Sequence, residues 1–295
     1  MFAGAAFILS VVMLLALYAT YRSPQKARPL SANALIMAGG VIFPALALSA
    51  LLVYGVQAMA GLRAGQPKTP AGLQVDVTGH QWWWEVRYRD SEDRVMLTDA
   101  NELHIPAGVP VTVSLRSDDV IHSFWVPTLA GKIDLIPGRS NRIVLQADQA
   151  GVYRGQCAEF CGAQHARMSF VVVARPPAEH DAWLARLAAD AAPPPTPLAQ
   201  QGLQAFRSGT CVACHTVRGH ATASAATDGG IRGPDLTHVG ARGALLANTL
   251  PNTRDNLAAI IARSQQIKPG NRMPSHPELD AGTLDALAAY LESLK

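Results

Sequence analysis

Two thiols, an imidazole and a thioether lie within one short segment of this chain, which reads Cys157-Ala-Glu-Phe-Cys161-Gly-Ala-Gln-His165-Ala-Arg-Met168. Soft ligands of this kind suit copper, and a single-copper electron-transfer site uses one cysteine, two histidines and a weak axial methionine. Here there are two cysteines. Two neighbouring thiolates can bridge two metal ions, so the segment predicts a binuclear copper site in which both ions share the transferred electron.

A second imidazole has to come from elsewhere in the chain. His122 lies in Val120-Ile-His-Ser-Phe-Trp-Val126, just after a segment that alternates like a strand, and the end of a strand can present it to the cysteine loop. A disulfide between Cys157 and Cys161 is the alternative, because paired cysteines in an oxidising compartment usually form one. The His and Met that follow the pair favour metal binding.

A second motif, Cys211-Val-Ala-Cys214-His215, has the C-x-x-C-H pattern of covalent c-type haem attachment. Two thioether bonds would fix the porphyrin, and His215 would become an iron ligand. A bare C-x-x-C could instead be redox-active or bind zinc. The adjoining histidine and the helical pattern of the surrounding residues favour haem.

The other axial iron ligand should be a soft donor well downstream if the haem carries electrons at high potential. Met273, in Asn271-Arg-Met-Pro274, precedes the last predicted helix and is the preferred candidate. The alternatives are His220, His238 and His276.

The elements that must position these groups change along the chain. Val109, Val111, Val113 and Leu115 alternate with polar or small residues, which predicts a half-buried strand. Further strands are predicted at 73–77, 142–145 and 169–173, and short strands at this spacing favour a β-sandwich or barrel. A helical pattern follows at 178–189, then a Pro-rich linker at 191–197, and leucines at helical spacing near the end.

The first part of the chain indicates a membrane. Only 16% of the 295 residues are charged, against roughly 25% in an average soluble protein. The runs Phe2 to Tyr18 and Ala32 to Ala60 each approach the ~20 residues that cross a bilayer. Arg22, Lys26 and Arg28 lie between them, so the positive-inside rule predicts a multi-pass hairpin whose two ends face outward. A cleaved signal peptide is the alternative for the first run.

These patterns divide the chain into four segments: a two-helix transmembrane hairpin at 1–64, a copper domain at 65–180, a helix and Pro-rich linker at 181–198, and an all-α haem domain at 199–295. The net charge of +3 is spread out, without the basic cluster that nucleic-acid binding requires.

Over residues 1–180 the chain resembles subunit II of cytochrome c oxidase, whose dicopper (CuA) centre lies in an all-β cupredoxin-like barrel. The resemblance implies that the backbone carbonyl of Glu159 completes the copper ligands and that its side chain binds a magnesium ion at the border with the catalytic subunit. The side-chain copper ligands that it implies are His122, Cys157, Cys161, His165 and Met168.

Two further segments match this family. The run Gly79-His-Gln-Trp82-Trp83-Trp84 implies Trp82 as the residue at which electrons arrive from a cytochrome, although most of these aromatics are expected in the core. The segment from Lys132 to Arg139 matches a loop that faces the catalytic subunit.

The last 95 residues or so resemble class I cytochromes c. In that family the helices at the two ends of the domain pack against each other, which implies this structural role for Gly202, Phe206 and Tyr290.

Together the resemblances imply a subunit of a proton-translocating oxidoreductase in a bacterial inner membrane, with its copper and haem domains on the outer side. Electrons would pass from a soluble or membrane-bound cytochrome c, or a similar donor, to the haem and then to the dicopper centre. From there they would reach catalytic subunit I of a haem-copper oxidase, which carries the oxygen site and assembles with further membrane subunits.

The second membrane segment departs from the family. Many members carry Glu-x-x-Trp-Thr-x-x-Pro there, and counting back from Pro44 this chain has Met37, Gly40 and Val41 instead. A nitric oxide reductase with the same copper module is therefore an alternative, and a stand-alone membrane-tethered electron carrier is another. A quinol oxidase subunit is disfavoured because that relative lacks the copper ligands.

Overall fold

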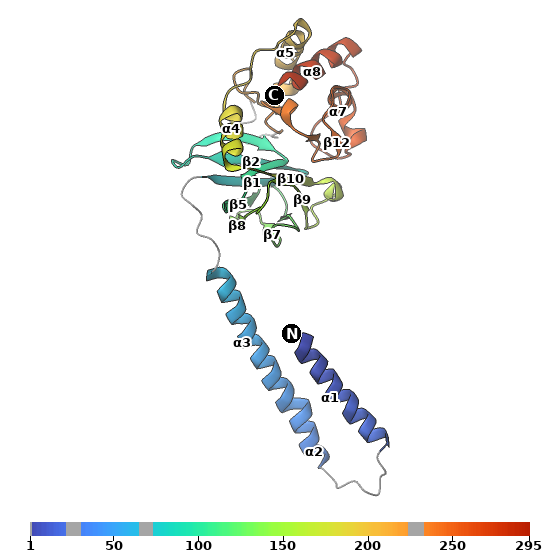
Figure 1. Ribbon diagram of the computed structural model, residues 1–295. Coiled ribbons are helices and arrows are strands. Elements are labelled where there is room, and N and C mark those ends of the chain that lie inside the picture. Colours follow the sequence, from blue (N-terminus) through green and yellow to red (C-terminus); the bar gives the residue numbers. More distant parts are fainter. Residues whose placement is uncertain (1, 22–30, 65–72, 224–232) are drawn as a thin grey trace. The chain divides into compact units, whose positions relative to one another are not determined.

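The computed structural model describes residues 2–21, 31–64, 73–223 and 233–295 of the chain (Figure 1). The basic residues Arg22, Lys26 and Arg28 and the joint from Gly65 to Gly72 lie outside the described residues. Two compact units result, one ending at Gln66 and the other beginning at Pro67.

The N-terminal unit is helical. It consists of α1 (Phe2–Tyr21), α2 (Ala32–Leu35), a π-helical segment η2 (Ile36–Ile42) and α3 (Phe43–Ala64). The stretches Gly4–Tyr21 and Asn33–Ala60 are long and apolar enough to cross a membrane, and no described residue in either is buried. Apolar surface of this extent indicates contact with lipid or another protein, which fits membrane anchoring.

The π-helical segment ends at Ile42, two residues before Pro44. The backbone N–H of Phe43 bonds to the carbonyl of Ala38, five residues back. Pro44 has no N–H to continue the usual ladder, and the pair Gly39-Gly40 weakens the helix just before it. The helix therefore adopts the wider turn at this point instead of breaking.

The first part of the second unit is a sandwich of two sheets with strand orders β3-β2-β1-β5-β8 and β4-β10-β9-β6-β7. Each sheet mixes antiparallel pairs with one parallel pair, β1 with β5 in the first and β4 with β10 in the second. The strands are β1 (Gln74–His80), β2 (Trp83–Arg89), β3 (Val95–Ala100), β4 (Glu102–Pro106), β5 (Val111–Ser117), β6 (His122–Trp125), β7 (Ile133–Leu135), β8 (Asn141–Leu145), β9 (Gly151–Cys157) and β10 (Ser169–Arg175).

The core of this sandwich follows the predicted alternation. Val111, Val113 and Leu115 on β5 are buried. Phe124 and Phe170, on β6 and β10 of one sheet, stack with ring centroids 4.5 Å apart, and Trp84 on β2 of the other sheet meets Phe124 edge-on. The predicted β-structure is thus confirmed.

Helix α4 (Pro177–Ala188) follows β10 and covers part of the sandwich (Figure 1). Its residue Trp183 is buried, stacks on His104 with centroids 3.9 Å apart and meets Tyr88 edge-on. The boundary that the sequence predicts at residue 180 lies inside this helix.

The rest of the unit is the predicted helical domain. It contains α5 (Pro197–Ser208), η4 (Thr210–Ala213), η5 (Val239–Ala241), β11 (Ala244–Leu245), β12 (Leu250–Pro251), α7 (Arg254–Ile267) and α8 (Ala281–Ser293). The side chains of Thr196, Thr253 and Asp280 accept hydrogen bonds from the first turns of α5, α7 and α8 respectively. These caps satisfy backbone N–H groups that have no partner inside the helix.

Gly202 allows α5 and α8 to approach closely. A Cβ atom on Gly202 would lie 2.0 Å from the carbonyl oxygen of Ala286. Next to this crossing, Phe206 and Tyr290 are buried with ring centroids 5.7 Å apart. The three residues therefore make the predicted contact between the two helices.

We expect Gly202→Ala to destabilise the haem domain by about 3 kcal/mol, the upper end for overpacking, because the new methyl group meets backbone rather than a movable side chain. Thermal unfolding followed by helical circular dichroism measures this change. Gly131→Ala is the matched control, since a Cβ there meets nothing within 4 Å. An equal melting temperature for both variants would contradict the role of Gly202.

Candidate metal centre and haem site

Three neighbouring strands bring the predicted copper ligands together. Strand β9 ends at Cys157, the ligand loop follows, and β10 begins at Ser169, one residue after Met168. His122 begins β6, which pairs with β9 so that Phe124 faces Cys157. Because β6, β9 and β10 are adjacent in one sheet, all the ligands meet at the same end of the sandwich.

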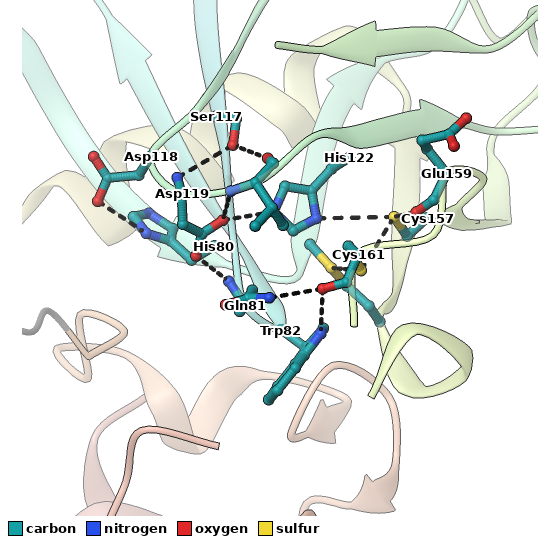
Figure 2. A network of polar contacts seen from close by, with 12 residues as sticks. His80, Gln81, Trp82, Ser117, Asp118, Asp119, His122, Cys157, Glu159 and Cys161 are labelled. Carbon is teal, nitrogen blue, oxygen red and sulfur yellow. Dashed lines mark hydrogen bonds and ion pairs between the residues drawn. The ribbon is translucent and has the colours of Figure 1, made fainter. Parts of the chain in front are cut away.

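The donor atoms converge on one small volume (Figure 2). The sulfur of Cys157 lies 3.9 Å from Nδ1 of His122, and that of Cys161 lies 3.6 Å from Nδ1 of His165 and 3.7 Å from the sulfur of Met168. One donor atom each from His122, Cys157 and Cys161 lie within 4.8 Å of one another.

The two cysteines do not form a disulfide. Their sulfurs are 3.7 Å apart, whereas a disulfide bond measures about 2.05 Å. The hydrogen bond between them lowers the pKa of Cys157 far below its usual range and raises that of Cys161. Both cysteines must be deprotonated to bind metal.

Asp119 fixes the orientation of His122. Its Oδ1 lies 2.8 Å from Nε2 of His122, so the other ring nitrogen faces the sulfurs. The second oxygen of Asp119 accepts a hydrogen bond of 2.7 Å from the backbone of Gln81. His122 is fully buried, and a Cβ on Gly79 would lie 2.8 Å from its ring. Burial lowers the pKa of His122, but the hydrogen bonds with Asp119 and Cys157 outweigh it and leave the pKa raised.

The backbone and side chain of Glu159 point to different places (Figure 2). Its carbonyl oxygen lies 3.1 Å from the sulfur of Cys157, within the group of donors. Its carboxylate is half-exposed and lies 3.7 Å from Nζ of Lys132. The carbonyl could therefore join the copper ligands while the carboxylate, beside Lys132, takes no part in them.

Trp82 lies directly behind the ligand loop. Its indole N–H donates a hydrogen bond of 3.0 Å to the carbonyl oxygen of Cys161, and the side-chain amide of Gln81 donates to the same oxygen at 2.8 Å. Trp82 and Trp84 are buried, and Trp83 stacks on His80. Two of the three tryptophans contact predicted copper ligands: Trp82 through this hydrogen bond to Cys161, and Trp84 through its ring, whose centroid lies 6.0 Å from that of His122.

A cavity of about 370 Å³ in the same unit brings Cys211, Cys214, His215 and Met273 together. Trp82 and Trp83 contribute to its wall. The apolar part of the lining includes Leu236, Val239, Leu245, Leu246, Leu257, Ile260, Ile261 and Leu291. An apolar cavity with few polar groups is typical of a cofactor site.

Hydrogen bonds to other residues of the haem domain hold the two predicted iron ligands in place. Nδ1 of His215 donates to the carbonyl of Pro234 at 2.8 Å, which leaves Nε2 for a metal. Burial lowers the pKa of His215, which favours the neutral ring that ligation requires. The carbonyl of Met273 accepts hydrogen bonds from Ser264 at 2.6 Å and from Gln265 at 2.7 Å.

The alternative histidines differ in position. His276 also lines the cavity, with its Nδ1 2.9 Å from a carboxylate oxygen of Glu278. His220 contacts the hydroxyl of Tyr290, and His238 contacts the carbonyl of Ala189. The structure thus leaves Met273 and His276 as candidates, and the neutral soft donor is Met273.

Sequence reasoning missed Asp119 beside the copper site and the ion pair of Arg242 with Asp99 beside the haem cavity. Asp119 orients a ligand, but an aspartate three residues before a histidine is not distinctive in a sequence. Arg242 lines the haem cavity and forms a buried ion pair of 2.8 Å with Asp99 of the sandwich, a contact between residues far apart in the chain. Both sets of residues nevertheless fit the groups expected for them, because soft donors converge at one site and the two cysteines of the C-x-x-C-H motif line an apolar cavity at the other.

Comparisons with known proteins agree with this division. Residues 91–175 match the family model "Cytochrome C oxidase subunit II, periplasmic domain", and residues 199–295 match the model "Cytochrome c". The periplasmic domain of subunit II of cytochrome oxidase (CoxB) of Bradyrhizobium japonicum aligns with 41% of this chain and 96% of its own length, at 31% identity and a TM-score of 0.37.

Two relatives named cytochrome c oxidase subunit 2 extend the comparison. The protein of Alkalihalophilus pseudofirmus is 41% identical over 76% of this chain and 61% of its own length. That of Bacillus subtilis is 31% identical over 77% of this chain and 64% of its own length. The chain therefore matches about three fifths of the length of these relatives. It contains a domain of the cytochrome c oxidase subunit II family followed by a cytochrome c domain.

Proposed function

We propose that this chain is the electron-receiving subunit of a haem-copper cytochrome c oxidase. The observation that carries the proposal is the position of Trp82, which lines the haem cavity and donates a hydrogen bond to the carbonyl of Cys161. A single side chain thus contacts both candidate redox sites.

At the copper site, the proposed ligands are those implied by the sequence: His122, Cys157, Cys161, His165 and Met168, with the carbonyl of Glu159. A bound dicopper centre would supply an electron acceptor that changes its geometry little. The protein keeps the donors close together, buries His122, Cys157, Cys161 and Met168 and, through Asp119, orients His122 (Figure 2). Such prior orientation lowers the rearrangement that accompanies electron transfer.

At the haem site, Cys211 and Cys214 would attach the porphyrin, with His215 and Met273 as axial ligands. A bound haem c would supply a one-electron carrier. The Pro234 carbonyl orients His215, the Ser264 and Gln265 side chains hold the Met273 backbone, and the apolar wall excludes water. A soft thioether ligand and a dry surrounding both favour a high reduction potential.

The proposed partners follow from the family. An external cytochrome c or similar carrier would be the donor, and a haem-copper catalytic subunit I with further membrane subunits would receive the electrons and reduce oxygen to water. The apolar helices α1 and α3 would anchor the chain in a bacterial inner membrane, with residues 65–180 and 199–295 on the outer side. The half-exposed Glu159 carboxylate is a candidate magnesium ligand at the border with subunit I, since magnesium prefers oxygen ligands.

A nitric oxide reductase with the same copper module is the second candidate. It is favoured by the second membrane segment, which has Met37, Gly40 and Val41 where many oxidase subunits place Glu, Trp and Thr. Consumption of oxygen, rather than nitric oxide, by the purified complex supports the oxidase. The reverse result supports the reductase.

Replacing one ligand at each site separates the two assignments. We expect the Cys157→Ser variant to lose both copper ions and keep its covalent haem, because only one bridging thiolate remains. The Cys211→Ala variant should lose one thioether bond to the haem while retaining copper. Metal analysis counts the coppers, haem staining after denaturing electrophoresis detects the covalent haem, and the pyridine haemochrome spectrum distinguishes one thioether bond from two. Two coppers in Cys157→Ser would contradict the copper assignment.

The role of Asp119 is tested by copper affinity. We expect Asp119→Ala to weaken copper binding by about 10- to 100-fold, the usual effect of removing a group that orients a ligand. Asp118→Ala is the matched control, because Asp118 is exposed and contacts His80 rather than a predicted ligand. Competition with a copper chelator gives both affinities. If the two variants bind copper equally, Asp119 does not position His122.

A further inference from the structure

The cytochrome domain packs against the loop that carries the predicted copper ligands. The side chain of Gln164 donates to the carbonyl of Pro269 at 2.8 Å, and the hydroxyl of Ser169 donates to that of Ala247 at 3.0 Å. Arg167 donates to the carbonyl of Ile267 at 2.5 Å. Each of these three residues is next in sequence to a predicted ligand, His165 or Met168. The ligand loop is therefore also the surface on which the cytochrome domain docks.

Lys268 lies at the centre of this contact. It follows the last residue of α7, only 2% of its surface is exposed, and its ammonium group donates to the carbonyls of Trp82 at 2.8 Å, Arg167 at 2.9 Å and Leu246 at 3.2 Å. A lysine has three hydrogens to donate, and all of them find an acceptor here. Two of the acceptors belong to the copper domain.

The charged groups on the two domains are complementary. Arg242 of the cytochrome domain is buried with Asp99 of the sandwich at 2.8 Å. Arg272 lies 3.6 Å from Asp119. Next to Arg242, the backbone N–H of Gly243 donates to Glu102 at 2.7 Å. Basic side chains of one domain thus meet acids of the other, and complementarity of this kind fixes the register of an interface.

The connection between the domains is fixed as well. Arg218 of the cytochrome domain donates to the carbonyls of Leu187 and Ala189 at the end of α4, and to that of Met96 on β3. The last carbonyls of a helix have no partner inside it, and a cation there satisfies them. The Pro-rich linker that follows α4 therefore joins two domains that are already in contact.

This packing covers Trp82. Its side chain is only 8% exposed, and a Cβ on Gly270 would lie 3.6 Å from its ring. The backbone carbonyl of the same residue accepts the bond from Lys268.

We infer that Lys268 is the positioning residue that holds the cytochrome domain against Trp82 and the ligand loop of the copper domain. Electron transfer from the haem to the copper site, the route of the proposed function, would then depend on this side chain for its geometry. The inference rests on the proposed function for the direction of transfer, but the packing itself does not depend on bound metal.

Oxidative labelling by hydroxyl radicals, read by mass spectrometry on the full-length holo-protein, tests the packing. In the unaltered chain Trp82 should be labelled as slowly as Trp84, which is 1% exposed in the sandwich core. In Lys268→Glu, where a carboxylate faces three carbonyl oxygens, Trp82 labelling should rise by about tenfold or more while Trp84 stays protected. Lys295→Glu makes the same charge change at an exposed position and should leave both rates unchanged.

Two results would overturn the inference: rapid labelling of Trp82 in the unaltered chain, or Trp82 protection that persists in Lys268→Glu. If Trp84 also becomes labelled in that variant, the sandwich has unfolded, and Lys268→Met replaces it in the comparison. This variant keeps the length of the side chain without its donors, and unchanged Trp82 protection in it counts equally against the role of Lys268.

The kinetic test uses rapid photoreduction of an external cytochrome c. In the unaltered protein the copper absorbance should change only after the haem is reduced, and Lys268→Glu should slow this second step about tenfold or more with both spectra unchanged. Equal rates for this step in the unaltered protein and in Lys268→Glu would refute the role of Lys268 in electron transfer. Absence of copper or haem would refute the proposed function instead, and the labelling result would still stand.

Discussion

The approach of the Cys157 and Cys161 sulfurs to 3.7 Å without a bond is the constraint on which the candidate centre depends. Two partly charged sulfurs repel each other in a buried place unless a proton or a metal lies between them. The sheet holds the two sulfurs close together, since β9 and β10 fix both ends of the ligand loop. The neighbouring strand β6 adds His122. Fold and metal chemistry thus need the same strand order.

The donor residues could be predicted from the sequence because most of them are close together in it. The spacing of Cys157, Cys161, His165 and Met168 is a local feature that can be recognised without knowing the tertiary structure, and so is the C-x-x-C-H motif. The alternation in β5 likewise predicts its buried face, because successive side chains on a strand point to opposite sides. Strand order and the pairing of β6 with β9 did not follow from these local patterns.

The groups that orient and cover the sites could not be predicted, because they are distant in sequence and chemically ordinary. Lys268 lies 186 positions from Trp82, and Arg242 lies 143 from Asp99. A lysine after a helix is typically solvent-exposed, and no periodicity distinguishes this one. Only the folded arrangement of the described residues shows that three carbonyls surround it.

Lys268 is informative because burying its charge costs free energy. Burial lowers the pKa of Lys268 to about 8, so the docked arrangement disfavours the charge that it contains. A buried cation of this kind adds little net stability compared with an apolar side chain, whereas leaving its partners without donors is unfavourable. What it contributes is geometry: its three acceptors lie on Trp82, on the ligand loop and on the cytochrome domain, and they can be satisfied together in only one relative position. Electron transfer between two sites depends steeply on their separation, so a residue that fixes one position serves transfer more than stability.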